Sequence, residues 1–97
     1  MGSKYTKASE TLTEARRPFL KIGDVLGAAQ CSQSLGNILC MQSKYTEASE
    51  TLTEAQRQFL EIGSTLGVAQ CSQRLGDILL MQSKYTEAFE TLTEAQR

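Results

Sequence analysis

Apolar residues recur at alternating spacings of three and four in the segment KYTEASETLTEAQRQFLEI. They are Tyr45, Ala48, Leu52, Ala55, Phe59 and Ile62. This spacing puts them on one narrow stripe and predicts a helix over residues 44–62. Ser43 is a suitable N-cap, and Gly63 is a suitable residue to end the helix. A strand is excluded because apolar and polar residues do not alternate and the segment is rich in Ala, Glu, Gln and Lys.

A second pattern, TLGVAQCSQRLGDILLMQ, predicts another helix over residues 65–81. Its apolar side consists of Leu75, Ile78 and Leu79. A row of small residues lies at spacings of three and four: Ala69, Ser72 and Gly76. Glycine inside a helix costs about 1 kcal/mol relative to alanine. Gly76 and its equivalent, Gly36, therefore suggest a close helix neighbour, although a duplication could also have copied a tolerated glycine.

The connections between these helices are very short. Asp24 and Ser64 are candidate N-caps, and they directly follow Gly23 and Gly63. Short connections make consecutive helices antiparallel neighbours.

The whole pattern repeats every 40 residues without insertion or deletion. Equivalent positions include Ser3, Ser43 and Ser83; Tyr5, Tyr45 and Tyr85; Ala29 and Ala69; Leu35 and Leu75; and Gly36 and Gly76. A period of this size indicates one supersecondary unit stacked on copies of itself. We name the helix containing LGxIL helix A and the helix containing KYTEA helix B.

We expect an all-α fold of antiparallel helix hairpins stacked as an α-solenoid, with five helices in the order B-A-B-A-B. The expected bounds are about 3–22, 25–41, 44–62, 65–81 and 84–97. Residues 1–97 would form a single repeat domain: a lone helix B at about 3–22, one repeat at about 25–62 and another at about 65–97. Pro18 removes a backbone hydrogen bond, so we expect the first helix to kink or fray near Arg17.

The motif AxxSxxLGxxL followed by KYxEAxxxLxxA resembles the tetratricopeptide repeat. Leu35 and Gly36 match the Leu-Gly pair of that family, and Leu39 stands at its tyrosine. The matching positions of helix B are Tyr45, Ala48, Leu52 and Ala55. The next repeat has the same matches at Leu75, Gly76, Leu79, Tyr85, Ala88, Leu92 and Ala95.

Some positions depart from the family pattern. Ser32 and Ser72 stand where the family often has tryptophan, the closing proline is absent, and helix B continues through FLEIG. The longer unit is similar to the 40-residue subclass, whose members occur in polarity adaptors and in arrays attached to signalling NTPases. The resemblance implies a right-handed superhelix whose A helices line a concave, partner-binding groove.

The groove side of helix A in that family corresponds here to a row of mostly polar residues. They are Gln30, Gln33, Asn37, Met41, Gln70, Gln73, Asp77 and Met81. Their spacing of three, four and four places each set on one helix face. Gln and Asn side chains can pair with the main chain of a bound peptide, and Met adds an adaptable apolar contact.

The alternative is that this row is simply the solvated side of helix A. Arg74 replaces Ser34 and Asp77 replaces Asn37 between otherwise similar repeats, so any selectivity is expected near Arg74 and Asp77. The carboxylate clamp that binds chaperone tails requires lysine where this chain has Gln33 and Gln70. That mode of binding is not expected here.

Composition narrows the function further. The net charge is −1, with a pI of about 5.4 and interspersed charges. The absence of a basic stripe argues against nucleic acid as a partner, and no apolar run is long enough for a membrane span. Three cysteines without paired spacing suggest a reducing, cytoplasmic compartment, and they are interpreted as small buried hydrophobes. Without histidine, a zinc site would need four thiolates, which three cysteines cannot supply, and no other cofactor is expected.

Catalysis finds little support in the sequence. The usual general base, histidine, is absent, and TLGVAQ and IGDVLG contain too little glycine for a phosphate loop. Glu47, Glu50 and Glu54 are interpreted as a solvated stripe paired with Lys44 and Arg57 and without a cleft around it. We therefore expect a protein without enzymatic activity.

The chain begins and ends on a helix B without polar capping residues, which solenoid termini normally carry. Phe89 replaces Ser9 and Ser49 and makes the last helix more apolar, and it is expected to take part in self-association together with Leu92. We expect two molecules to associate there, by end-stacking or by helix exchange, because near-identical units favour swapping. Two functions remain open: a scaffold that binds a peptide or protein segment in its groove, as a fragment of a longer array, and a self-assembly module.

Overall fold

The computed structural model describes residues 4–95, with side chains described through Thr93. It contains four helices: α1 (Lys4–Lys21), α2 (Val25–Met41), α3 (Tyr45–Glu61) and α4 (Thr65–Ala95). Residues 4–95 contain no strand. The all-α expectation is therefore confirmed, and the outermost predicted positions, 1–3 and 96–97, lie outside the described residues.

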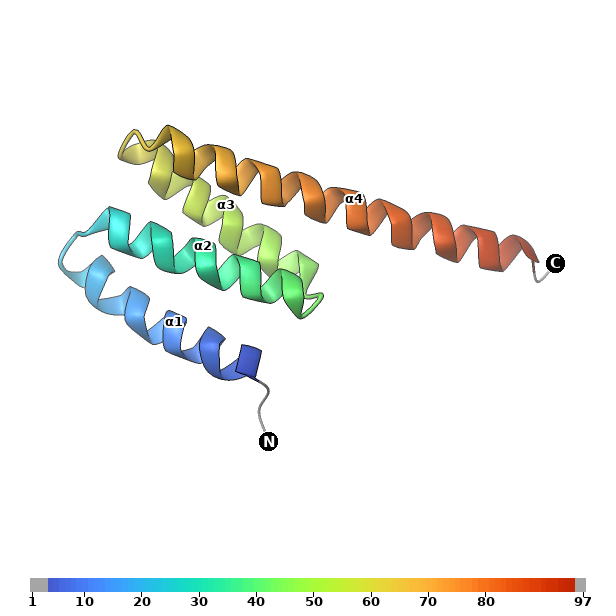
Figure 1. Cartoon of the computed structure of the whole chain (residues 1–97), viewed down its shortest axis with the longest axis horizontal. Coiled ribbons are helices and arrows are strands. Elements are labelled where there is room, and N and C mark those ends of the chain that lie inside the picture. The colour runs from blue at the N-terminus through green and yellow to red at the C-terminus, as the bar shows by residue number, and fades with distance from the viewer. Residues whose placement is uncertain (1–3, 96–97) are drawn as a thin grey trace.

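The helices pack in chain order, so each lies against the next one (Figure 1). α2 lies between α1 and α3, and α3 lies between α2 and α4. The predicted stripe of α3 forms the centre of the core, where Ala48, Leu52, Ala55 and Phe59 are at most 3% exposed. Burial of a large apolar side chain contributes about 1.5–3 kcal/mol, so this stripe accounts for much of the packing energy.

The predicted caps are confirmed at two of three helix starts. Asp24 accepts a hydrogen bond from the Gly27 backbone N–H at 3.0 Å, and Ser64 accepts one from Gly67 at 3.3 Å. Gly23 and Gly63 have φ of +78° and +73°, the left-handed conformation that suits glycine after a helix.

Ser43 is not the N-cap of α3. Its φ is +61°, and Lys44 occupies the cap position without a side-chain hydrogen bond. Ser43 takes the role that glycine has in the other two connections: the Lys44 N–H donates to the Leu39 carbonyl at 2.9 Å and closes the turn. A left-handed residue with a side chain costs about 1–2 kcal/mol, which the surrounding packing must offset.

The expectation that α1 frays near Arg17 is wrong, because α1 continues through Pro18 to Lys21. Proline removes only its own N–H donor, and the following residues still bond back to the helix. One such bond runs from the Ile22 N–H to the Pro18 carbonyl at 3.1 Å. The proline lies in the last turn, where a missing bond disturbs little.

The expectation of five helices is also wrong. The sequence predicts separate helices at 65–81 and 84–97, but residues 65–95 form one continuous helix, α4, of 31 residues. At 1.5 Å per residue it is about 46 Å long, and its C-terminal half projects beyond the other helices (Figure 1). The octapeptide MQSKYTEA thus contains a turn at 42–44 in its first copy (41–48) and is helical throughout in its second copy (81–88).

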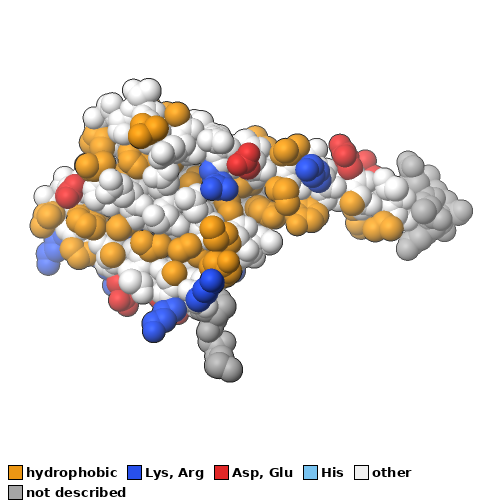
Figure 2. All heavy atoms as spheres, viewed as in Figure 1, with side chains coloured by type: hydrophobic (Ala, Val, Ile, Leu, Met, Phe, Trp, Pro, Cys, Tyr) orange, Lys and Arg blue, Asp and Glu red, His pale blue; other side chains and the backbone are white. Residues whose placement is uncertain are grey.

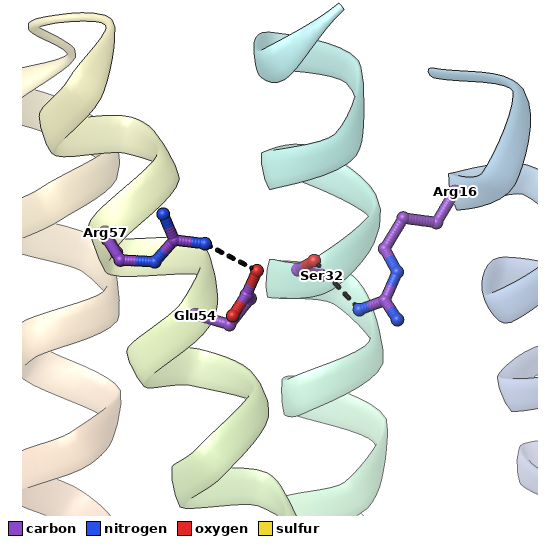
Figure 3. A network of polar contacts seen from close by, with 4 residues as sticks. All are labelled: Arg16, Ser32, Glu54 and Arg57. Atoms are coloured by element: carbon purple, nitrogen blue, oxygen red, sulfur yellow. Dashed lines mark hydrogen bonds and ion pairs between the residues drawn. The ribbon is translucent and has the colours of Figure 1, made fainter. Parts of the chain in front are cut away.

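Polar contacts link neighbouring helices at equivalent positions of the repeat. Arg16 Nη1 of α1 donates to Ser32 Oγ of α2 at 3.3 Å (Figure 3). One repeat later, Gln56 Nε2 of α3 donates to Ser72 Oγ of α4 at 2.5 Å. Serine thus stands at a site where a long side chain from the preceding helix B can reach its hydroxyl, and a tryptophan there would occupy the same space.

Candidate partner-binding groove

Six of the nine predicted groove residues surround one hollow between α2 and the first half of α4. They are Gln33, Asn37, Gln70, Gln73, Arg74 and Asp77. The volume of this hollow is about 300 Å³. The 40-residue period explains the arrangement, because equivalent faces of two successive A helices turn toward the same space. We call this hollow the polar hollow.

Two hydrogen bonds cross the polar hollow and join its walls. Gln33 Nε2 donates to Gln70 Oε1 at 2.9 Å, and Arg74 Nε donates to Asn37 Oδ1 at 3.1 Å. Each bond uses only part of the donor and acceptor capacity of these groups. The remaining amide and guanidinium groups can therefore still bind a ligand.

Met41 and Met81 surround a second, smaller hollow of about 190 Å³ that adjoins the polar hollow. The other residues around it are Cys40, Tyr45, Arg74, Asp77 and Ile78. Arg74 and Asp77 border both hollows, so the two form one continuous surface. We call the smaller one the apolar hollow, because Met, Tyr, Ile and Cys side chains dominate it.

Sequence reasoning missed Cys40, Tyr45 and Ile78 as members of this surface. Tyr45 and Ile78 satisfy the helical core pattern, and Cys40 has no equivalent cysteine in the next repeat. No local signal separates a core residue from one at the edge of a hollow. Gln30 was predicted but borders neither hollow, and its side chain is exposed on α2, one turn before Gln33.

The surface carries one positive and one negative charge, Arg74 and Asp77. Neither forms an ion pair with another residue in the described part of the chain, whereas Glu54 and Arg57 of α3 form one at 2.8 Å (Figure 3). Burial raises the pKa of the Cys40 thiol; Arg74 opposes this shift and Asp77 adds to it. A raised thiol pKa disfavours the reactive thiolate, so the Cys40 side chain is better suited to an apolar contact than to nucleophilic chemistry.

Cys71 matches the interpretation of the cysteines as small buried hydrophobes. It is fully buried in the core, and burial raises the pKa of its thiol. Cys31 and Cys40 are half-buried, and all three thiols are free.

The expectation that Glu47 and Glu50 lie away from any cleft is wrong. They border a hollow of about 420 Å³ between α1 and α3, above Leu35 and Leu39 of α2. Both carboxylates are nonetheless exposed. The residues that line the hollow include no histidine and no cysteine, so its geometry gives no basis for assigning acid–base chemistry.

Comparison with known proteins identifies one family. The model of the tetratricopeptide repeat matches residues 26–97, which is most of the chain. Neither the curated proteins nor the solved structures gave a match. None of the helices within residues 4–95 combines the length and the apolar character that crossing a bilayer requires.

Proposed function

The chain belongs to the tetratricopeptide-repeat family, whose members generally mediate protein–protein interactions, and on that premise we propose that it binds an extended peptide segment across the polar and apolar hollows. The proposal includes the right-handed stacking typical of the family, with α2 and the first half of α4 as the lining helices. The observation that carries it is the continuity of the two hollows through Arg74 and Asp77.

The polar hollow suits the main chain of a peptide. An extended segment presents both N–H and C=O groups, and the Gln and Asn amides around the hollow offer both acceptors and donors. The bonds that already cross the hollow, from Gln33 to Gln70 and from Arg74 to Asn37, hold these groups in place before a ligand arrives. Such preorganisation lowers the entropy cost of binding.

The apolar hollow suits one side chain of that peptide. Its volume of about 190 Å³ is enough for a Leu, Met or Phe side chain, and Met41 and Met81 can adapt to its shape. Arg74 and Asp77 lie beside this anchor, and each lacks an ion-pair partner among the described residues. We therefore expect the ligand to combine an apolar anchor with an adjacent charged residue of either sign.

A peptide array tests the proposal. Wild type should capture peptides that carry an apolar residue next to a charged one, and the double variant Gln33→Ala/Gln73→Ala should capture them at least about tenfold more weakly. Arg74→Ala should remove the acidic peptides selectively. Arg57→Ala is the matched control, because Arg57 is an exposed arginine of α3 that borders neither hollow.

Equal capture by wild type and the double variant would discard the groove assignment. A direct readout is alkylation of Cys40, which borders the apolar hollow. A bound peptide should slow its modification, whereas a peptide bound elsewhere should leave the rate unchanged. The second candidate function, self-assembly, concerns a different part of the molecule, the projecting half of α4.

A further inference from the structure

The repeat provides an internal comparison between α2, which is covered on both sides, and the first half of α4, which is not. Ala29, Ser32, Gly36 and Leu39 of α2 are buried. Their equivalents 40 residues later are Ala69, Ser72, Gly76 and Leu79, and all four are exposed. The difference is large at leucine: Leu39 is 7% exposed and Leu79 is 68% exposed. We call the four residues of α4 the open face.

The contact that the open face lacks is visible in the preceding repeat. Leu52 of α3 lies against Gly36 so closely that a Cβ on Gly36 would be 2.5 Å from Leu52 Cγ. At the equivalent Gly76, a Cβ would have no neighbour within 4 Å. The residue equivalent to Leu52 is Leu92, and it is 64% exposed. The space beside Gly36, which we call the Gly36 notch, is thus filled by Leu52, whereas the equivalent Gly76 notch is empty. The same chain also carries an exposed equivalent of Leu52, namely Leu92.

An apolar row on the projecting half of α4 also lacks a partner. Phe89 and Leu92 are 71% and 64% exposed, and hydrophobic atoms are visible along this part of the helix in Figure 2. Isolated exposed hydrophobes are ordinary, but a row along one helix face is typical of an interaction surface.

A straight α4 cannot fill its own notch. Gly76 and Leu92 are 16 residues apart, which is about 24 Å along a helix. Tyr85 is also held at the start of α3, where its ring lies 6.1 Å from that of Tyr45. The segment that is free to pack elsewhere is therefore the part of α4 after Tyr85.

We propose that two copies of this chain exchange residues 86–95, so that each segment packs on the Gly76 and Leu79 end of the open face of the other copy. Leu92 of each copy then fills the Gly76 notch of its partner copy, as Leu52 fills the Gly36 notch within one chain. The occupant is a second copy because residues 86–93 repeat the sequence of residues 46–53, apart from Phe89 in place of Ser49. Ser49 is half-buried at the edge of the packed face, so Phe89 would add apolar contact there.

The helix register makes the contact between the two copies symmetric, so it is complete with two chains. Two antiparallel α4 helices that place Gly76 opposite Leu92 also place Leu92 opposite Gly76, with the two-fold axis midway, near Lys84. Such a contact is isologous, so it ends at two copies rather than growing into a fibre. Straightening residues 81–84 into helix also avoids a left-handed Ser83, the conformation that Ser43 must adopt in the equivalent turn.

Sedimentation velocity over a range of micromolar concentrations tests the association. We expect a species of twice the 10.7 kDa chain mass. Leu92→Glu should raise its dissociation constant at least about 100-fold, because it removes an apolar contact at both sites. Leu60→Glu is the matched control: Leu60 is 68% exposed on α3 and belongs neither to the open face nor to the exchanged segment, so the change should have little effect.

The proposed exchange has its hinge at Ser83, where the equivalent residue Ser43 forms a turn, and substitutions at these two serines form a matched pair. Ser83→Gly favours a turn over a continuous helix, so it should raise the dissociation constant by about tenfold or more. Ser43→Gly makes the same change in a turn that the exchange does not alter, and should leave the constant within about twofold. Equal effects of the two substitutions would contradict the hinge.

Mixing two singly substituted chains tests the exchange itself. Gly76→Cys on one copy and Leu92→Cys on the other should form a covalent heterodimer on mild oxidation. Wild type and each variant alone provide the background from the native thiols. A chain that stays at 10.7 kDa, a mixture without the covalent heterodimer, or a mass that keeps rising beyond the dimer would each overturn the proposal.

Discussion

The same substitution at two equivalent glycines should have different effects on stability. Gly36→Ala and Gly76→Ala each replace a mid-helix glycine within the sequence LGxIL, so each gains about 1 kcal/mol of helix propensity. Only Gly36 faces a neighbour: its new Cβ would lie 2.5 Å from Leu52 Cγ, and Leu52 is fully buried. Overpacking of this kind typically costs about 1–3 kcal/mol.

The propensity gain cancels when the two variants are compared, so their difference isolates the steric cost. We expect Gly76→Ala to stabilise the chain by about 1 kcal/mol, and Gly36→Ala to be neutral or to destabilise it by up to about 2 kcal/mol. For a domain of this size, that difference separates the two melting temperatures by at least about 4 °C.

Urea unfolding followed by circular dichroism measures both values, at a concentration where sedimentation shows monomer. The Leu92→Ala background serves as the control, because it removes the side chain that would occupy the Gly76 notch in another copy or in a folded-back chain. Equal changes in the free energy of unfolding for the two variants would refute the assignment of the Gly36 notch as filled and the Gly76 notch as empty.

Three further outcomes follow from single contacts. Asp24→Ala should lower the free energy of unfolding by about 1 kcal/mol in urea titrations, because Gly27 loses its cap; an unchanged midpoint would contradict the capping role. Phe59→Ala should cost about 3–5 kcal/mol and unfold much of the chain at room temperature by circular dichroism, since its ring fills the core beside Gly67. Alkylation of Cys40 should be slow at pH 7 and faster above the pH range in which ordinary thiols ionise, because its raised pKa keeps the thiolate scarce. Arg74→Ala should raise the pKa of Cys40 further and slow the reaction, because Arg74 favours the thiolate. An unchanged dependence of rate on pH in this variant would refute the electrostatic contact.

The placement of the groove residues followed largely from the sequence. The 40-residue period put equivalent faces of two A helices side by side, and six of the nine predicted side chains border one hollow. The apolar hollow could not be predicted, because its members come from α2, α3 and α4 and meet only when the helices pack. The sequence also gave no sign that the Gln33 and Gln70 side chains bond to each other.

The sequence by itself determined the helical pattern, the short capped connections and the stripe from Ala48 to Phe59, because these depend on spacing within about 20 residues. It could not determine whether MQSKYTEA turns or continues, since the same eight residues do both. At 41–48 the turn is retained because α3 is buried between α2 and α4, which offsets the left-handed Ser43. At 81–88 no described helix packs on the segment that follows, so nothing offsets the cost of a turn and the intrinsic helix preference of these residues prevails. The local sequence is the same in both places, so packing decides which conformation forms.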